Sequence, residues 1–212
     1  MPKYSFNTQA FTLIELVMTM AIAGILVTIA IPSFNSTLTS IRLTSYANDL
    51  VGALNLARSE AIRRGIKVTV RKFDNHSCPI NSVIGTNGAN WEDGWHVFTD
   101  TDMSNVGKCV TGDELIRAYP PLMPSYIFRG NNNISNYISF LPSGQSNING
   151  SFVICNNSDG LGIPKANTSR LIIIDNIGRV RMGLDTNNDR IPNTDNTASS
   201  ATNITSCTPP FS

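Results

Sequence analysis

The sequence predicts an α+β protein in which a long N-terminal helix lies across an antiparallel β-sheet. The first 65 residues contain an apolar run followed by a helical hydrophobic period. Residues 66–183 instead break into short β-prone runs separated by Asn, Gly, Asp and Ser. A chain of 212 residues with 15% charged residues has room for one membrane segment and a single globular domain.

The apolar run from Phe11 to Ile31 contains one ionisable side chain, Glu15. As a helix it would extend about 30 Å, roughly the thickness of bilayer hydrocarbon. We therefore expect residues 11–31 to form a transmembrane helix. A secretory signal peptide fits less well, because only Lys3 and the N-terminal amine are basic and the apolar core is too long. Since a carboxylate in a spanning helix is costly, Glu15 indicates a function.

Residues 32–65 are predicted to continue the helix into the globular domain. Pro32 is expected to kink the helix, but apolar side chains then recur at spacings of three and four. These positions are Leu43, Ala47, Leu50, Val51, Leu54, Ala57, Ala61 and Ile62. Arg63 and Arg64 place positive charge in the last turn, and Gly65 can form a left-handed C-terminal cap.

The β-prone runs form the predicted sheet that covers this helix. They are Lys67–Phe73, Trp95–Thr99, Leu115–Ala118, Ile138–Leu141, Phe152–Cys155, Leu171–Asp175 and Arg179–Met182. Residues 176–178 have the composition of a tight hairpin connection between the last two runs. Trp95 and Phe98 are expected in the sheet core and not in a ligand site.

The four cysteines lack the short paired spacings of a zinc site. Disulfides formed in an oxidising compartment fit better, and four cysteines allow three pairings. We favour Cys78–Cys109 and Cys155–Cys207, because the second pair would tether the polar tail of residues 184–212. Free, buried cysteines remain the alternative.

The residues Phe11-Thr12-Leu13-Ile14-Glu15 resemble the start of type IV prepilins and type II secretion pseudopilins. The resemblance implies that residues 1–10 are a leader, that prepilin peptidase cleaves between Ala10 and Phe11, and that it methylates the new amine of Phe11. It also implies that Glu15 pairs with the amine of a neighbouring subunit during assembly. Such pairing would recover much of the desolvation cost of both charges. The chain departs from the family at Ala10, where the family nearly always has glycine.

Three further blocks, Leu56–Gly65, Gly94–Asp100 and Gly178–Arg181, resemble the GspH/FimT family of minor pilins and pseudopilins. The resemblance implies a type IV pilin-like fold and a single-pass protein of the bacterial inner membrane. The globular domain would be periplasmic or in a pilus at the cell surface. We expect a minor pilin of a type IV pilus that acts in assembly, and the alternative is a protein H-like minor pseudopilin of a type II secretion system. The implied partners are other pilins through the N-terminal helix, prepilin peptidase and the membrane.

Arg179 and Arg181 would face the same side of a strand and could contact successive phosphates. In some DNA-uptake members of the family, a motif of this form is implicated in DNA binding, so the resemblance raises double-stranded DNA as a partner in natural transformation. Arg170 and Arg190 could extend the basic patch. The alternative is a solvated strand face with local ion pairs. The formal net charge of +1 gives no global support for nucleic-acid binding.

Asp185, Asn187 and Asp189 show the alternating oxygen side chains of a calcium-binding loop. The pattern is incomplete, because Arg190 occupies the glycine position of such a loop, and a polar, flexible segment is the alternative. We expect no metal and no cofactor. The sequence contains no phosphate-binding glycine loop, nucleophile elbow or metal-ligand cluster, so we do not expect an enzyme.

Overall fold

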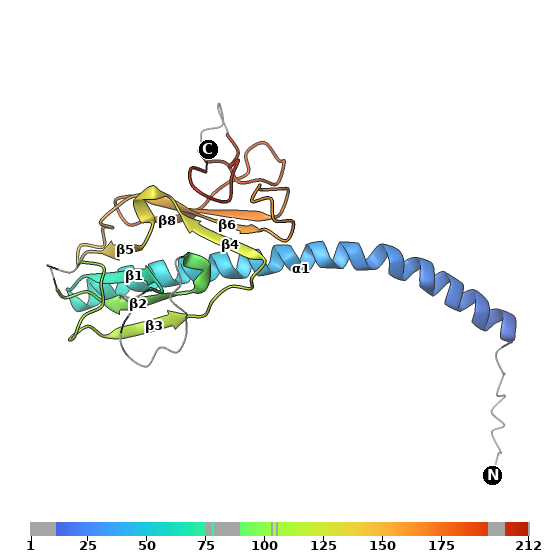
Figure 1. The fold of residues 1–212 in the computed structure, drawn as a ribbon, viewed down its shortest axis with the longest axis horizontal. Coiled ribbons are helices and arrows are strands. Elements are labelled where there is room, and N and C mark those ends of the chain that lie inside the picture. Colours follow the sequence, from blue (N-terminus) through green and yellow to red (C-terminus); the bar gives the residue numbers. More distant parts are fainter. Residues whose placement is uncertain are drawn as a thin grey trace, which may run out of the picture. The chain divides into compact units, whose positions relative to one another are not determined.

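A computed structural model describes residues 12–74, 78, 90–102, 104, 106–194 and 202–211, without the side chains of Ile29, Ala30, Pro32, Ser33 and Asn132. The elements are α1 (Leu13–Arg64), β1 (Val68–Lys72), η1 (Trp91–Asp93), β2 (Trp95–Thr99), β3 (Leu115–Tyr119), β4 (Tyr126–Gly130), η2 (Asn132–Ile134), β5 (Tyr137–Phe140), β6 (Gly150–Asn156), β7 (Ser169–Ile174) and β8 (Val180–Met182) (Figure 1). The chain divides into two compact units, Met1–Thr39 and Ser40–Ser212.

The first unit contains the N-terminal part of α1. Thr12 precedes the helix, and its Oγ1 accepts a hydrogen bond from the backbone N–H of Glu15 at 3.3 Å, the contact of an N-cap threonine. The helix continues through Pro32 without interruption. Every residue from 12 to 28 is exposed. The hydroxyls of Thr19 and Thr28 bond to the carbonyls three residues earlier, so these polar groups are satisfied within the helix.

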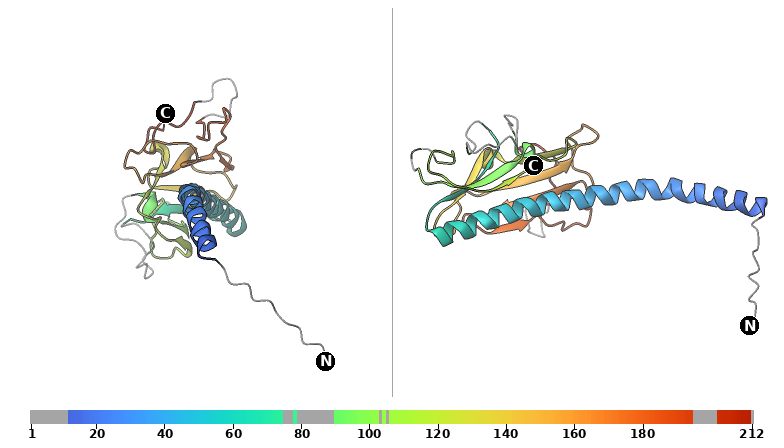
Figure 2. Two further views of the ribbon diagram at one scale, coloured as in Figure 1. Left: turned by 90° about the vertical axis from the view of Figure 1, so that its right-hand side faces the viewer. Right: turned by 90° about the horizontal axis from the view of Figure 1, so that it is seen from below.

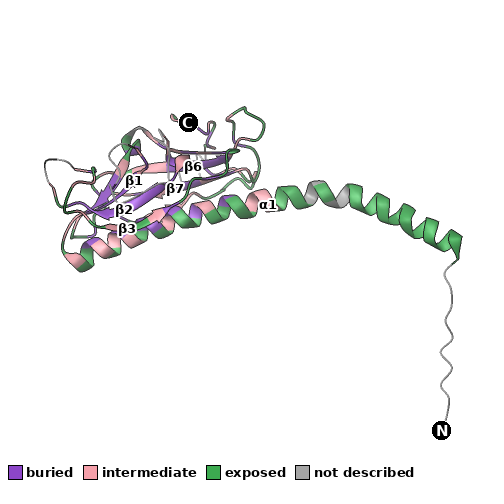
Figure 3. Cartoon of the chain, turned by 60° about the horizontal axis from the view of Figure 1, so that its bottom comes forward, coloured by how far each residue is buried: buried purple, intermediate pink, exposed green. Residues whose placement is uncertain are grey.

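In the second unit, the helical period predicts the buried side of α1 well. The fully buried side chains are Leu43, Ala47, Leu50, Ala53, Leu54, Ala57 and Ala61. Figure 3 shows how buried and exposed residues alternate along this part of the helix. Ile62 departs from the prediction because it is 54% exposed. The predicted cap is present, since Gly65 has φ 67° and donates its N–H to the carbonyl of Ala61 at 3.0 Å.

The predicted α+β fold class is confirmed, because α1 packs on antiparallel strands. The described strands form two four-stranded sheets, however, with orders β3-β2-β1-β5 and β4-β6-β7-β8. All strand pairs are antiparallel. The sequence did not predict β4, which follows a proline-rich stretch and contains Arg129. The division into two sheets was also not foreseen.

One hydrophobic core fills the space between α1 and both sheets. It joins Leu50 and Leu54 of α1 to Val97 of the first sheet and to Phe128 and Phe152 of the second. Figure 2 shows this half of α1 running along the sheets. All members of this core follow Thr39 in the chain, so the unit Ser40–Ser212 contains the contacts that hold it together.

A second, smaller core lies on the other face of the sheet that contains β6 and β7. Its buried members are Val153, Cys155, Leu171, Ile204, Cys207 and Phe211. The last three belong to the C-terminal tail. The tail is therefore more than a tethered polar segment, because it supplies apolar side chains that cover this sheet.

Candidate functional site

The first candidate site is the start of α1. Ala10 and Phe11, where cleavage and methylation are predicted, lie outside the described residues. Glu15 is exposed in the first turn of the helix, where a negative charge is favourable. In the described part of the chain, its carboxylate has no ion-pair partner. Among the described residues, no helix is both long enough and apolar enough to cross a membrane.

The second feature is a junction centred on Arg58 of α1. The Arg58 Nε donates to the carbonyl of Gly144 at 3.0 Å, and one terminal guanidinium nitrogen donates to the carbonyl of Ile177 at 3.2 Å. Gly144 lies in the turn between β5 and β6, and Ile177 lies in the hairpin between β7 and β8. The structure thus brings together two of the blocks that carry the family resemblance, Leu56–Gly65 and Gly178–Arg181.

Gly178 fits this junction because it has no side chain. Its φ is 78°, and a Cβ placed on it would lie 2.2 Å from the carbonyl oxygen of Gly144. Gly144 has φ 79°, and its Cβ would lie 2.8 Å from the side chain of Ile62. Sequence reasoning identified the hairpin glycine but missed Gly144, because the two turns are far apart in the chain. Only glycine combines this φ with so close a backbone approach.

Arg179 and Arg181 lie at the outer edge of the second sheet. β8 is the last strand of that sheet, and Arg181 pairs with Ile173 of β7. Arg179 directly precedes β8, and its Nε lies 3.3 Å from Asp175 Oδ2 in an exposed ion pair. Arg181 is half-buried and has no ion pair within the described residues. Asp175 thus neutralises part of the predicted patch.

Arg170 does not extend this patch, which corrects the prediction. Side chains alternate along β7, so Arg170 shares a face with Ile172 of the main core, whereas Arg181 shares a face with Ile173. The Arg170 guanidinium donates to Ser40 Oγ at 2.9 Å and to Thr44 Oγ1 at 3.2 Å on α1. Burial lowers the pKa of Arg170. Arg170 therefore links β7 to the helix.

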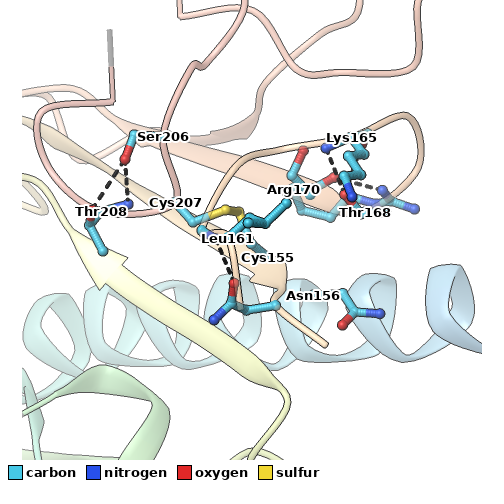
Figure 4. The surroundings of a disulfide bond; sticks show 12 residues. Cys155, Asn156, Leu161, Lys165, Thr168, Arg170, Ser206, Cys207 and Thr208 are labelled. Atoms are coloured by element: carbon cyan, nitrogen blue, oxygen red, sulfur yellow. Dashed lines mark hydrogen bonds between the residues drawn. A yellow bond between two sulfur atoms is a disulfide. The ribbon is translucent and has the colours of Figure 1, made fainter. Parts of the chain in front are cut away.

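Both favoured disulfides are present. Cys78–Cys109 and Cys155–Cys207 join residues that are 31 and 52 positions apart. Figure 4 shows the second bond between β6 and the tail. The backbone N–H of Cys207 also donates to the carbonyl of Gly162 at 2.9 Å. The tail is thus fixed both to a strand and to the loop that follows it.

The carboxylates of the predicted calcium loop accept hydrogen bonds from other groups of the tail. Asp185 Oδ2 accepts from the N–H of Arg190 at 2.7 Å, and Asp189 Oδ1 accepts from the N–H of Ile191 at 2.8 Å. Asp189 Oδ2 accepts from the amides of Asn203 and Asn187. The bond from Asn203 is the main cause of the lowered pKa of Asp189. In the described chain, no group of three His, Cys, Asp or Glu residues could hold a metal ion.

The predicted core aromatics are buried, on opposite faces of the first sheet. Trp95 lies in the main core, whereas Phe98 lies on the outer face. His96 stacks there between Phe73 and Phe98, at ring distances of 5.2 and 5.0 Å. Neither ring nitrogen of His96 has a hydrogen-bond partner in the described chain. Burial, and secondarily the charge of Arg71, lower the pKa of His96 to about 4.

Comparison with known protein families identifies the family of this chain. The family described as Type II transport protein GspH matches residues 46–178, which is more than half of the chain. The chain belongs to the GspH family. Its residues 5–31 match the prokaryotic N-terminal methylation motif, which implies a membrane-anchored or pilus-associated protein. The predicted relationship to GspH/FimT proteins is thus confirmed. No curated protein matches the sequence significantly.

Two crystal structures of the type IV minor pilin FimU of Pseudomonas aeruginosa (strain PAO1) are similar to this GspH-family chain. The first has 17% sequence identity and a TM-score of 0.49, and the match covers 78% of this chain and 94% of FimU. The second has 18% identity and a TM-score of 0.48, and it covers 78% of this chain and 99% of FimU.

Proposed function

We propose that this GspH-family chain is a minor pilin, a membrane-anchored subunit that acts in the assembly of a type IV pilus. The supporting observation is the uninterrupted helix from Leu13 to Arg64, which connects the methylation motif to the β-domain. The apolar residues from 12 to 28 are all exposed in the single chain. Burying them in lipid before assembly, and against other subunits afterwards, would remove this surface from water.

In this proposal, prepilin peptidase cleaves between Ala10 and Phe11 and methylates the amine of Phe11. The Glu15 carboxylate then pairs with the terminal amine of a neighbouring subunit. The test is Glu15→Gln, which keeps the size of the side chain and removes its charge. We expect the variant to be cleaved and retained in the membrane but absent from sheared filaments.

Thr12→Ala is the matched control for this experiment, because it removes the cap but keeps the carboxylate. It should still enter filaments. Normal incorporation of Glu15→Gln would contradict the proposed pairing, and equal defects in both variants would indicate that helix capping, and not charge, is required.

The alternative system is type II protein secretion, which the description of the matching family names. The two systems are distinguished by deleting the gene and measuring surface pili and secreted protein in the same strain. The pilus proposal requires loss of pili with normal secretion. Normal piliation together with a secretion defect would assign the chain to the secretion system.

A second candidate function is binding of double-stranded DNA for uptake. It is favoured by the position of Arg181 on the outer strand β8 and of Arg179 directly before that strand. Among the described residues, Arg181 has no ion pair and Arg179 has one exposed carboxylate partner. Two phosphate contacts would give weak binding that falls steeply with salt.

The DNA proposal is tested by measuring duplex affinity across a salt series for the wild type and for Arg179→Ala with Arg181→Ala. We expect the double variant to reduce the slope of log K against log salt by about 2. Asp175→Asn should strengthen binding, because it removes the charge that neutralises Arg179. Arg63→Ala, an exposed arginine on α1, is the control. Unchanged affinity in the double variant would exclude this surface.

A further inference from the structure

A pocket of about 240 Å³ lies between the start of β7 and the segment that follows β8. Two arginines line it, Arg170 from β7 and Arg190 from the tail. Ser169, Asn167 and Asp185 also contribute to its wall. We call this the Arg170/Arg190 pocket. It is separate from the proposed DNA contact at Arg179 and Arg181, and the inference goes beyond the proposed filament role.

Among the described residues, Arg170 bonds to uncharged groups. Its guanidinium is half-buried and donates to neutral oxygens, namely the Ser169 carbonyl at 2.7 Å and the hydroxyls of Ser40 and Thr44. No carboxylate pairs with it in the part of the chain that the structure describes. A partly buried cation without a counter-ion is unfavourable, so an anion in the adjacent pocket would stabilise it.

The backbone of Arg190 is held in a strained conformation. Its φ is 69°, a left-handed value that glycine adopts at little steric cost and arginine rarely adopts. Two hydrogen bonds fix it there, from the N–H of Arg190 to Asp185 Oδ2 at 2.7 Å and from the N–H of Asn167 to the carbonyl of Arg190 at 2.9 Å. Asn167 is also left-handed, with φ 62°. Strain of this kind occurs at functional sites, and here it places an arginine on the pocket wall.

Two further polar groups define the chemistry of the pocket. Ser169 is fully buried, and its hydroxyl has no hydrogen-bond partner within the described chain. Among the described residues that line the wall, Asp185 is the acidic one, and its Oδ2 already accepts a hydrogen bond from the backbone N–H of Arg190. Two arginines and one aspartate among the described lining residues give the wall a formal charge of +1.

We propose that the Arg170/Arg190 pocket binds a phosphate group. Guanidinium groups form strong, charge-assisted hydrogen bonds with phosphate oxygens, and two of them can hold one tetrahedral anion from two sides. The phosphate is supplied either as the free ion or as part of a nucleic-acid backbone. Both sources present the same oxygens.

The test uses the full chain in nonionic detergent, with inorganic phosphate titrated against chloride at constant ionic strength. Tryptophan fluorescence reports the Tm. At a phosphate concentration ten times its Kd, we expect the wild-type Tm to rise by about 3 to 6 °C. Arg190→Gly should unfold at or above the wild-type Tm without phosphate, because it relieves strain, and should lose this phosphate-dependent rise.

Asn188→Gly is the matched control. Asn188 has φ 61° in the same segment but does not line the pocket, so this variant should keep the full phosphate response. A phosphate response that is absent from the wild type, or equal in the wild type and Arg190→Gly, would overturn the proposal.

A parallel measurement with duplex DNA identifies the source of the phosphate. If Arg190→Gly loses the Tm response to inorganic phosphate and also binds DNA several-fold more weakly, the pocket receives backbone phosphates. If only the response to inorganic phosphate is lost, the pocket binds the free ion. Because Arg179 and Arg181 are unchanged in this variant, failure of the proposed DNA contact would appear separately.

Discussion

Removing the Cys155–Cys207 disulfide by Cys155→Ala with Cys207→Ala should strongly destabilise the second unit. The bond closes a loop of 52 residues. In the chain-entropy model, a loop of this length restricts the unfolded state by about 4 kcal/mol. For a unit of this size, that corresponds to a decrease in Tm of about 8 to 16 °C.

The assay is urea unfolding of residues 40–212, which contain both cores, with the free energy of unfolding extrapolated to zero denaturant. Hydrogen exchange of the tail amides is measured in parallel. We expect faster exchange around Ile204 and Phe211, because these side chains cover the sheet only while the tail is held in place.

Cys78→Ala with Cys109→Ala is the comparison variant. Its loop of 31 residues predicts a loss of about 3.7 kcal/mol, similar to that of the first variant, but the tail amides should stay protected. The reasoning would be refuted if the Cys155/Cys207 variant lost less than about 1 kcal/mol, or if its tail exchanged at the wild-type rate.

Two other predictions follow from buried groups. The pKa of His96 is about 4 in the folded chain and about 6.5 when unfolded, so the unfolded state binds the additional proton. Stability is therefore complete above pH 6.5 and is lost as the pH falls towards 4, by about 2 kcal/mol at pH 5 and about 3 kcal/mol at pH 4. His96→Phe should remove this dependence in denaturant unfolding at a series of pH values, and a persistent slope between pH 7 and 5 would contradict the assignment. Gly178→Ala should cost about 3 kcal/mol, because it combines left-handed backbone with a clash at Gly144. Gly160→Ala, with φ 72° and nothing within 4 Å of the added Cβ, should cost only about 1 kcal/mol, and equal losses would show that the clash is relieved.

Much of the fold could be predicted because it depends on local patterns. The spacing of Leu50, Leu54 and Ala57 identifies the buried side of α1, and Gly65 marks its end. β4 was missed because its stability is not local: Arg129 forms an ion pair with Glu92 of η1, and Phe128 packs on Trp91. Neither contact leaves a periodic signal in the sequence.

In the candidate sites, too, local motifs could be predicted from the sequence and contacts between distant residues could not. The motif from Phe11 to Glu15 could be interpreted from the chain alone. For the four cysteines, the sequence favoured the correct pairs among three possible pairings, and the structure decided between them. The contact of the Arg170 side chain with α1 could not be predicted. Alternation along β7 defines two faces of the strand but does not say which face packs against α1. The composition of the tail suggested a polar segment, and the burial of Ile204 and Phe211 was not foreseen.

The sequence by itself determined the apolar N-terminal helix, the strands with clear β-propensity, and the family to which the chain belongs. These properties depend on residues close together in the chain, so their physical cause is visible in the order of side chains. Only the tertiary structure decided that the strands form two sheets, that Arg58 and Gly178 meet at one junction, and that Arg170 and Arg190 line one pocket. Such contacts join residues far apart in sequence, and packing of the whole core selects them.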